Sequence, residues 1–426
     1  MEQFVVSGKK PLCGEVNISG AKNAAVALIP AAILSNDICV IENLPNIKDI
    51  TNLVNGIREM GIEVEYTCEN TIKIDSTTLN THIAPRDSMN KIRASYYMLG
   101  ALLARDNKAE VPLPGGCNFG VRPFDQHIKG FEALGAVVTI EAGYIKAYAE
   151  KLVGTSIYLD VISVGATINI MIAAVFAEGV TVIENAAKEP HIVDTANFLN
   201  KMGCKIKGAG TDVIKIVGVP RDSLKGVEYT TIPDQIEAGT FMVLAAATCG
   251  DITVNNIIPK HLESVTAKLL EMGCDIEEGD TFVRVIGVEN LKPTNIKTLV
   301  YPGFPTDMQP QILVALTIAK GESKVQETIW DSRFQYVREL IKMGANISVN
   351  GKLATVTGVN ELWGTEVSAL DLRAGAAVLI AGLSSKTSGK TVIKNAKLID
   401  RGYADIVNKL RNLGADIERV EHVENE

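Results

Sequence analysis

Residues 200–219 read NKMGCKIKGAGTDVIKIVGV, and variants of this stretch recur along the chain. Residues 270–288 read LEMGCDIEEGDTFVRVIGV, and residues 341–359 read IKMGANISVNGKLATVTGV. In each copy a Met-Gly pair closes an apolar pattern of helical spacing, which is typical of a helix stopped by a C-terminal glycine. The alternating apolar residues that follow predict two short strands around a turn.

The copies are evenly spaced. Six glycines mark them: Gly61, Gly135, Gly203, Gly273, Gly344 and Gly414. Successive glycines lie 74, 68, 70, 71 and 70 residues apart, which indicates one supersecondary unit repeated through the chain. Each copy is preceded by an Ala- and Leu-rich helix pattern, such as ATINIMIAAVFAEG (166–179), and a strand pattern such as VTVIENAA (180–187). With an entry strand, each unit is predicted to be a βαβαββ element of an α/β protein.

The sixth copy is incomplete. It stops at DIERVEHVENE (416–426), and the first residues, QFVVSGKKPLCG (3–14), resemble the strand that it lacks. We therefore expect the N-terminus to complete the last unit. Three units per domain then predict a continuous domain of residues 20–230 and a discontinuous one that joins 1–19 to 231–426, with two crossing strands as a hinge. The alternative is a single ring or solenoid of six units.

Composition narrows the class of protein. With 426 residues, 46% hydrophobic and 22% charged, the chain is typical of a soluble globular protein of two or more domains. A net charge of −8 gives no support for a nucleic-acid partner. The start, MEQFVVSGKKPLCG, does not have the pattern of a signal peptide. The apolar stretch 24–34 is too short for a bilayer, and we expect Pro30 to break it, so no membrane partner is predicted.

Cysteine and histidine usage predicts neither metal nor cofactor. Seven cysteines without a Cys-x-x-Cys pair indicate free thiols in a reducing cytoplasm. The five histidines show no ligand spacing. The stretch SGKTVIK is not a phosphate loop, because Ser384 stands where that motif needs its first glycine. Nothing in the sequence points to a particular protein partner.

One cysteine, Cys117, has unusual surroundings. It lies in EVPLPGGCNFGVRPFDQHIKGFEALGA (110–136), where prolines and glycines precede it instead of an apolar run. We predict a thiol presented by a loop. The alternative is a small buried apolar residue, which is how we interpret the other six cysteines.

Charged or polar residues recur where the Ala-rich helices begin: Lys22, Asn23, Arg93, Glu237, Asp307, Asp371 and Arg373. A cation at a helix start opposes the helix dipole unless an anion binds there. Arg122 and Arg401 occupy comparable places before the second helix of their units. The cations could converge from both domains on a small, highly anionic substrate. The alternative is a set of solvated or loosely paired helix ends.

Several motifs carry a resemblance over essentially the whole chain: SGAKNAA (19–25), PGGC (114–117), RPFDQHI (122–128), SVGAT (163–167), NAAKEPHIVDTANFL (185–199), FPTDMQ (304–309), DLRA (371–374) and DRGY (400–403). Together they resemble the UDP-N-acetylglucosamine 1-carboxyvinyltransferases, which are enolpyruvyl transferases. The resemblance implies an inside-out α/β barrel fold, with two similar domains of three units and an active-site cleft between them. It also implies the first committed step of peptidoglycan precursor synthesis in a bacterial cytoplasm.

The implied reaction transfers enolpyruvyl from phosphoenolpyruvate to the 3′-hydroxyl of UDP-N-acetylglucosamine by addition and elimination, with release of phosphate. It requires a base at the sugar hydroxyl, an acid at the methylene carbon and cations around the phosphate and carboxylate. These two small molecules are the predicted partners, and no cofactor is implied.

The resemblance assigns residues to these roles. The implied catalytic residues are Cys117, Asp307, Lys22 and Arg401. Phosphoenolpyruvate contacts are implied for Lys22, Arg122 and Arg401. Contacts to the UDP-sugar, or a place in the same cleft, are implied for Asn23, Arg93, Arg122, Pro123, Phe124, Asp125, Gln126, Ser163, Val164, Gly165, Asp307, Ile329, Asp371 and Arg373.

Three of these positions need comment. Cys117 matches a lid thiol that protonates the methylene, bonds covalently to phosphoenolpyruvate and is the target of fosfomycin. Its lid carries Phe119 where relatives often have a smaller aliphatic residue, which would alter lid packing. Asp307 is the candidate base, with a residue that complements a helix dipole as the plain alternative. His127 is either a lid or nucleotide contact or a surface helix histidine.

Two other functions remain open on the sequence. A sister enzyme of the same fold transfers enolpyruvyl to shikimate 3-phosphate, but it lacks the PGGC and SGAKNAA motifs. A non-catalytic repeat protein that presents a groove to a partner would have no need of Lys22, Cys117 and Asp307 together.

Overall fold

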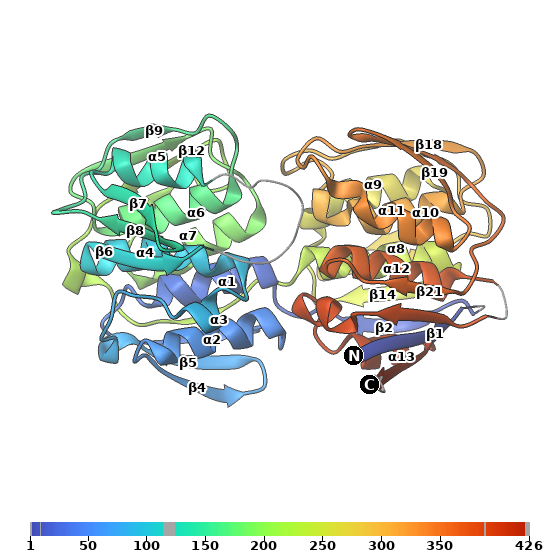
Figure 1. Cartoon of the computed structure of the whole chain (residues 1–426), viewed down its shortest axis with the longest axis horizontal. Coiled ribbons are helices and arrows are strands. Elements are labelled where there is room, and N and C mark those ends of the chain that lie inside the picture. The colour runs from blue at the N-terminus through green and yellow to red at the C-terminus, as the bar shows by residue number, and fades with distance from the viewer. Residues whose placement is uncertain (1, 9, 114–123, 387–388, 422–426) are drawn as a thin grey trace. The chain divides into compact units, whose positions relative to one another are not determined.

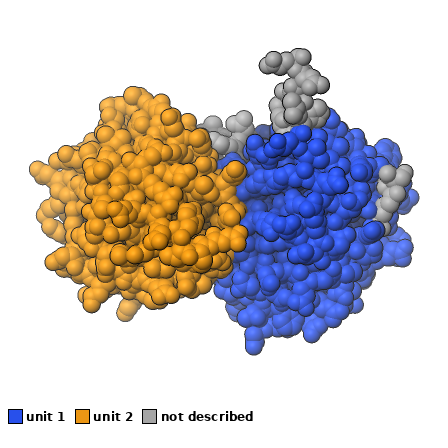
Figure 2. Space-filling view, turned by 90° about the horizontal axis from the view of Figure 1, so that it is seen from below, with its two compact units in different colours: residues 1–19, 233–426 blue, residues 20–232 orange. Residues whose placement is uncertain are grey.

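The computed structural model describes residues 2–8, 10–113, 124–386 and 389–421. The predicted site residues Cys117, Arg122 and Pro123, and Phe119 beside them, lie outside the described residues. By its internal contacts the chain divides into two compact units, coloured separately in Figure 2. We call residues 20–232 the continuous unit, and residues 1–19 with 233–426 the discontinuous unit. The sequence predicted the second boundary between residues 230 and 231.

The continuous unit contains the following described elements (Figure 1). Its helices are α1 (Lys22–Ala32), α2 (Lys48–Glu59), α3 (Arg86–Met89), α4 (Tyr97–Asp106), α5 (Asp125–Ala133), α6 (Val164–Ala173) and α7 (Pro190–Met202). Its 3-10 turns are η1 (Ser76–Thr78), η2 (Arg93–Tyr96), η3 (Ala174–Phe176) and η4 (Arg221–Ser223). Its strands are β3 (Ile38–Glu42), β4 (Glu63–Cys68), β5 (Thr71–Asp75), β6 (Lys108–Pro112), β7 (Val137–Glu141), β8 (Tyr144–Tyr148), β9 (Ser156–Tyr158), β10 (Val180–Glu184), β11 (Lys205–Lys207), β12 (Val213–Val217) and β13 (Glu228–Thr230).

The discontinuous unit has a similar order of helices and strands, without a counterpart of the short helix α3. Its helices are α8 (Gln235–Thr248), α9 (Glu263–Glu271), α10 (Gln309–Thr317), α11 (Val337–Lys342), α12 (Leu372–Ser384) and α13 (Ile406–Asn412). Its 3-10 turns are η5 (Pro259–Leu262), η6 (Thr306–Met308), η7 (Arg333–Tyr336) and η8 (Ala396–Arg401). Its strands are β1 (Glu2–Ser7), β2 (Cys13–Asn17), β14 (Asp251–Asn255), β15 (Asp275–Glu278), β16 (Phe282–Ile286), β17 (Ile296–Lys297), β18 (Glu322–Gln326), β19 (Asn346–Asn350), β20 (Leu353–Thr357), β21 (Glu366–Ser368), β22 (Thr391–Lys394) and β23 (Asp416–Glu421).

Each repeat forms its own small sheet. In the third repeat the order is β11-β12-β10-β9, where the entry strand β9 is parallel to the central strand β10 and the other neighbours are antiparallel. Four other repeats have the same four-stranded pattern in the described part of the chain. In the second repeat the described strands number three, and the entry strand is reduced to one parallel bridge between Ile83 and Glu110. The predicted βαβαββ unit is confirmed.

The chain ends close the sixth repeat as predicted. Strand β1 lies between β22 and β23 and is antiparallel to both, with Val5 opposite Val392 on one side and Glu418 on the other. The entry strands of the first and fourth repeats come from distant parts of the sequence. Strand β13, from the end of the continuous unit, pairs with β3, and β2, from the start of the chain, pairs with β14.

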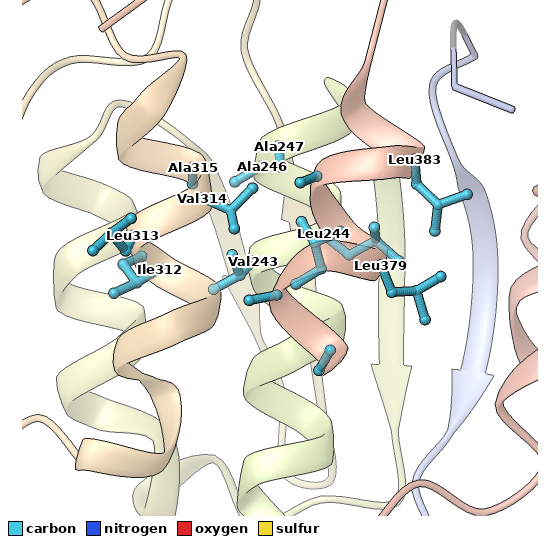
Figure 3. Close-up of a cluster of buried hydrophobic side chains, with 14 of the residues drawn as sticks. Val243, Leu244, Ala246, Ala247, Ile312, Leu313, Val314, Ala315, Leu379 and Leu383 are labelled. Carbon is cyan, nitrogen blue, oxygen red and sulfur yellow. The ribbon is translucent and has the colours of Figure 1, made fainter. Parts of the chain in front are cut away.

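The fold places helices inside and sheets outside. One helix of each repeat is apolar and buried on all sides; in α8, every residue from Ile236 to Thr248 is buried. In the discontinuous unit α8, α10 and α12 pack together through side chains such as Val243, Val314 and Leu379 (Figure 3). The strands alternate buried and more exposed residues, so each sheet covers the helices with one face only. This is the predicted inside-out α/β barrel.

Helix α1 corrects one expectation. Pro30 does not break it, because the helix continues to Ala32. Proline removes one backbone hydrogen bond here, near the end of a helix whose residues from Ala24 onward are all buried, so packing outweighs the loss.

The repeat glycines end their helices as predicted. Gly61, Gly135, Gly203, Gly273, Gly344 and Gly414 have φ of 91°, 98°, 119°, 95°, 92° and 90°. In each repeat the next residue donates its backbone N–H to the carbonyl five positions back, as Cys204 does to Leu199 at 3.0 Å. This is the Schellman arrangement, which satisfies the last carbonyls of the helix.

A second repeated signal was not recognised in the sequence. An asparagine in the left-handed region directly follows the central strand of four repeats: Asn43, Asn185, Asn256 and Asn395. The side-chain amides of Asn43, Asn185 and Asn256 donate to the carbonyls of Thr231, Leu159 and Ile18, at 2.8, 2.8 and 2.7 Å. These asparagines tie the end of the entry strand to the end of the central strand, next to the start of the buried helix.

Candidate active site

The predicted site residues come from both units. In the continuous unit Lys22 is the first residue of α1, and its Nζ lies 2.8 Å from Asp49 Oδ2 in the first turn of α2. The Lys22 and Asp49 side chains are only 12% and 5% exposed. Asn23 follows and is half-buried. Lys22 is therefore not a solvated helix end. The cation is held in place by a buried carboxylate that sequence reasoning missed.

Of the two alternatives for His127 on α5, the structure rules out the surface helix histidine. Its side chain is 6% exposed and packs against Tyr96 and Phe124, with ring centroids 4.9 and 4.7 Å away. Burial lowers the pKa of His127 to about 3, and the nearby charge of Arg93 acts in the same direction. The ring is therefore neutral at pH 7.

The tautomer of His127 follows from its partner. Asn169 Nδ2 lies 3.1 Å from His127 Nδ1, and because an amide nitrogen can only donate, Nδ1 accepts and the ring proton is on Nε2. The buried Asn169 also donates to the carbonyl of Tyr96 and accepts from the backbone of Gly100, both at 2.8 Å. Asn169 thus links α4, α5 and η2, the turn whose first residue is Arg93.

The stretch Ser163–Gly165 lies against the same group. Ser163 caps α6 by accepting from the N–H of Ala166 at 3.3 Å. A Cβ on Gly165 would lie 2.8 Å from the Tyr96 hydroxyl oxygen and 3.1 Å from His127 Nε2. Only glycine lets the backbone approach these two polar atoms so closely. Val164, between them, is half-buried at the start of the helix.

The three described residues of the 122–126 stretch have distinct surroundings. Phe124 precedes the first turn of α5 and packs on Tyr96 and His127. Gln126 is buried and bound to Asp160, since its Oε1 accepts from the Asp160 N–H at 2.8 Å and its Nε2 donates to Asp125 Oδ2 at 2.9 Å. We infer that Gln126 orders the loop before Ser163.

In the discontinuous unit Asp307 is the centre of a charged cluster. Its carboxylate is 34% exposed and lies between two arginines that are almost fully buried. Arg373 Nη2 is 3.3 Å from Asp307 Oδ2, and Arg333 Nη2 is 3.7 Å from Oδ1. Burial alone would lower the pKa of Arg373, but Tyr403 and Asp307 outweigh it and raise that pKa above its ordinary value. Asp307 is therefore more than a residue that complements a helix dipole.

Two other charged helix entries have structural partners. Asp371 is the N-cap of α12 and accepts from the N–H groups of Arg373 and Ala374, at 2.7 and 3.0 Å. Glu237 is 1% exposed and is paired with Lys409 at 2.6 Å. Burial raises the pKa of Glu237, although Lys409 opposes the shift. Not every charged helix entry therefore points to an anionic ligand.

The remaining predicted residues of this unit lie in turns. Arg401 ends η8 and is half-buried. Ile329, after β18, donates its N–H to Glu327 Oε1 at 2.8 Å. Arg333, Glu327 and Tyr403 were not predicted. Arg333 precedes α11 as Arg401 precedes α13, so the repeat comparison could have found it, whereas no sequence pattern distinguishes Glu327.

The cysteines require a correction. Cys39, Cys204 and Cys274 are buried as expected, but Cys13 and Cys68 are exposed. Cys13 lies on β2, where the alternation of the strand puts it on the face opposite the buried Val16. Cys68 is the last residue of β4, where the register of the pairing with β5 shifts.

Metal sites and membrane-spanning helices were sought in the described residues. In the part of the chain that the structure describes, no group of three or more His, Cys, Asp or Glu side chains is placed to hold a metal ion. No helix there is long and apolar enough to cross a membrane.

Comparison with known proteins gives a consistent family. The family model described as EPSP synthase (3-phosphoshikimate 1-carboxyvinyltransferase) matches residues 6–410. UDP-N-acetylglucosamine 1-carboxyvinyltransferase 2 of Clostridium acetobutylicum is 57% identical over 98% of this chain and 99% of its own length. UDP-N-acetylglucosamine 1-carboxyvinyltransferase 3 of Caldanaerobacter subterraneus subsp. tengcongensis is also 57% identical, over 99% of this chain and 100% of its own.

Solved structures agree on the fold. The enolpyruvyl transferase NikO from Streptomyces tendae has a TM-score of 0.89 at 26% identity and covers 98% of this chain and 99% of its own. EPSP synthase from Acinetobacter baumannii has a TM-score of 0.76 at 20% identity, covers 99% and 100%, and bears on the fold alone. The chain therefore belongs to the EPSP synthase family, and within it to the UDP-N-acetylglucosamine 1-carboxyvinyltransferases.

Proposed function

We propose that the chain transfers the enolpyruvyl group of phosphoenolpyruvate to the 3′-hydroxyl of UDP-N-acetylglucosamine and releases phosphate. The observation that carries this proposal is the 57% identity, over almost the full length of both chains, to a relative named for that transfer. The reaction would be the first committed step of peptidoglycan precursor synthesis. We expect it in the cytoplasm, as the unpaired cysteines of the sequence suggest.

The chemistry is an addition followed by an elimination. The sugar oxygen bonds to the central carbon of phosphoenolpyruvate, its proton goes to a base, and the methylene carbon takes a proton. The bond from the central carbon to the phosphate oxygen then breaks, and the methyl carbon loses a proton to restore the double bond. Phosphate leaves with the electron pair of the broken bond.

We assign the base to Asp307 and the proton donor to Cys117, which lies outside the described residues. The contacts of Asp307 with Arg373 and Arg333 support this assignment, because they aim its carboxylate and leave it partly accessible. Cys117 would act as a thiol, and the positive charge of Arg122, five residues later in the sequence, would favour the thiolate that remains after the proton is donated.

We assign phosphoenolpyruvate to Lys22, Arg122 and Arg401, and the sugar nucleotide to Asn23, Arg93, the stretches 122–126 and 163–165, and Ile329. The ion pair of Lys22 with Asp49 supports a fixed position for this ammonium group. A cation held in place stabilises charge on a transferred group without reorganising during the reaction. Asp371 would contribute through Arg373, whose helix it caps.

The acceptor is tested by measuring phosphate release from phosphoenolpyruvate with either UDP-N-acetylglucosamine or shikimate 3-phosphate. The second acceptor is a specific alternative, because the matching family model carries its name. We expect release with the sugar nucleotide only. Release with shikimate 3-phosphate alone would assign the chain to the sister activity, and release with neither would favour a non-catalytic role.

A further inference from the structure

Two repeats lack the asparagine that directly follows the central strand in the other four, and one of them is the repeat that carries Asp307. Four repeats have an asparagine directly after the central strand, as Asn43 after β3 and Asn256 after β14. In the fifth repeat the residue after β18 is Glu327. A carboxylate can only accept where an asparagine amide donates, so Glu327 cannot make the contact that Asn43, Asn185 and Asn256 make.

The backbone shows that the last residues of the two central strands correspond. In the first repeat Thr231 donates its N–H to the carbonyl of Glu42, the last residue of β3, at 3.0 Å. In the fifth repeat Thr298 donates its N–H to the carbonyl of Gln326, the last residue of β18, at 2.9 Å. Glu327 therefore directly follows the central strand as Asn43 does, but without the left-handed backbone of Asn43, and it donates its N–H to the carbonyl of Lys352 at 2.8 Å.

A neighbouring residue takes over the lost contact. The amide of Asn43 donates to the carbonyl of Thr231, and in the fifth repeat the hydroxyl of Thr328 donates to the carbonyl of Thr298. The link between entry strand and central strand therefore remains. The Glu327 side chain is not needed for this link.

Glu327 connects two predicted parts of the site. It is 1% exposed, and its Oε2 accepts from the hydroxyl of Thr306 at 3.0 Å, next to Asp307. Its Oε1 accepts from the N–H of Ile329 at 2.8 Å and of Trp330 at 3.2 Å, in the loop assigned to the sugar nucleotide. The Thr298 hydroxyl also donates to Oε1, at 2.9 Å.

The segment beside Asp307 is held from a second direction. Arg333 Nη2 donates to the carbonyl of Thr306 at 3.3 Å and pairs with Asp307 Oδ1 at 3.7 Å. With the Thr306 hydroxyl bound to Glu327, the backbone of Thr306 has little freedom to turn. A buried carboxylate with several donors resists rearrangement, because any displacement leaves polar groups unsatisfied.

We propose that Glu327, acting through the hydroxyl of Thr306, is a positioning residue that sets the carboxylate of Asp307 relative to the loop at Ile329. This inference rests on the proposed function, in which Asp307 receives the proton of the sugar hydroxyl. It predicts that the Thr306 hydroxyl affects the rate of the reaction more than the binding of either substrate.

The test compares Thr306→Val, which removes the hydroxyl at nearly constant volume, with Thr306→Ser, which keeps it. Because small misplacements of a catalytic group cost up to about 10²-fold, we expect kcat of T306V to fall at least about tenfold. The KM for phosphoenolpyruvate and the calorimetric Kd for UDP-N-acetylglucosamine should stay within about threefold, and T306S should keep most of the wild-type kcat.

A matched control is available in the same unit. The Thr294 hydroxyl donates to the carboxylate of Glu271, and the Thr294 N–H donates to Ser323 near the other end of β18. Thr294→Val removes the same kind of bond there. It should lower the melting temperature about as much as T306V does and leave kcat unchanged.

The outcomes separate this inference from the proposed function. A T306V enzyme with wild-type kcat, or a T306S enzyme as slow as T306V, would overturn the role of Glu327 while an active wild type keeps the transfer reaction. An inactive wild type would overturn both. If T306V does not fold, Glu327→Gln decides, since its amide cannot accept all four donors: a lowered kcat at unchanged Kd supports the role, and an unchanged kcat overturns it.

Discussion

At the scale of single residues, the structure changes the meaning of several predicted positions. In the sequence Asp307 is an acidic residue at a helix start, and in the structure its carboxylate lies between two buried arginines. Lys22 was a cation that opposed a helix dipole, and it is paired with Asp49. These partners are far away in the sequence, so composition and spacing around Asp307 and Lys22 could not have indicated them.

Asp307→Asn tests the base. Loss of a general base lowers the rate by roughly 10²–10⁴-fold, while the amide keeps the shape needed to bind the sugar. The substitution also leaves Arg373 and Arg333 without their anion, so we expect a melting temperature a few degrees lower. Phosphate release, calorimetry with UDP-N-acetylglucosamine and a melting curve check the three effects. A variant that turns over at the wild-type rate would show that Asp307 only holds the arginines.

Cysteine labelling distinguishes exposure from reactivity. Because Cys13 and Cys68 are exposed, a general alkylating agent should label them as well as Cys117. Fosfomycin, which needs the phosphoenolpyruvate site, should modify Cys117 alone and stop turnover. Peptide mapping of the wild type and of a Cys13→Ser, Cys68→Ser double variant provides the comparison. Loss of fosfomycin labelling in that double variant would refute the assignment of Cys117.

At the scale of elements, local signals predicted most of what is found. The glycine after each second helix predicted the helix end, and all six adopt positive φ. The incomplete sixth copy predicted that β1 would join β22 and β23. The burial of His127 was not predicted, because it depends on Tyr96 and Asn169, which other elements contribute. The exchange of Asn for Glu327 was overlooked because its meaning depends on the fold around Thr306.

One contact between elements has a predictable pH dependence. Asp194 on α7 is buried, and its Oδ1 accepts from the Tyr229 hydroxyl on β13 at 2.6 Å. Burial raises the pKa of Asp194 to about 6, although the bond from Tyr229 opposes the shift. Between about pH 4 and pH 6 the folded chain therefore binds more protons at Asp194 than the unfolded chain, so this group makes stability fall as pH rises through that window.

Asp194→Asn should remove this dependence, because the neutral amide can still accept from Tyr229. A difference of about two pKa units corresponds to roughly 3 kcal/mol. The free energy of unfolding of the variant, relative to that of the wild type, should therefore rise by up to that amount from about pH 4.5 to about pH 7.5. Urea unfolding at both pH values measures the gain. Asp212→Asn, at an exposed position, is the control with no such gain. A stability difference between D194N and wild type that is independent of pH would contradict the prediction.

At the scale of the whole molecule, the predicted site draws on both compact units. Lys22 and Arg93 belong to the continuous unit, and Asp307, Arg373 and Arg401 to the discontinuous one. If these residues act on one pair of substrates, we predict that the sugar nucleotide brings the two units together when it binds. Small-angle scattering should then show a smaller radius of gyration with UDP-N-acetylglucosamine. Arg93→Ala should weaken the binding of UDP-N-acetylglucosamine. The radius of gyration of this variant should therefore decrease less at the same concentration of the sugar nucleotide. Unchanged dimensions in an active wild type would refute closure.

The central claim is transfer by addition and elimination to UDP-N-acetylglucosamine, and the reaction in deuterated water tests it most directly. The methylene carbon of phosphoenolpyruvate gains a solvent proton in the first step and loses one of three hydrogens in the second. Proton NMR should therefore reveal an enolpyruvyl sugar nucleotide with deuterium in its vinyl group. A product without deuterium would contradict the protonation step, and no product from UDP-N-acetylglucosamine would contradict the function itself.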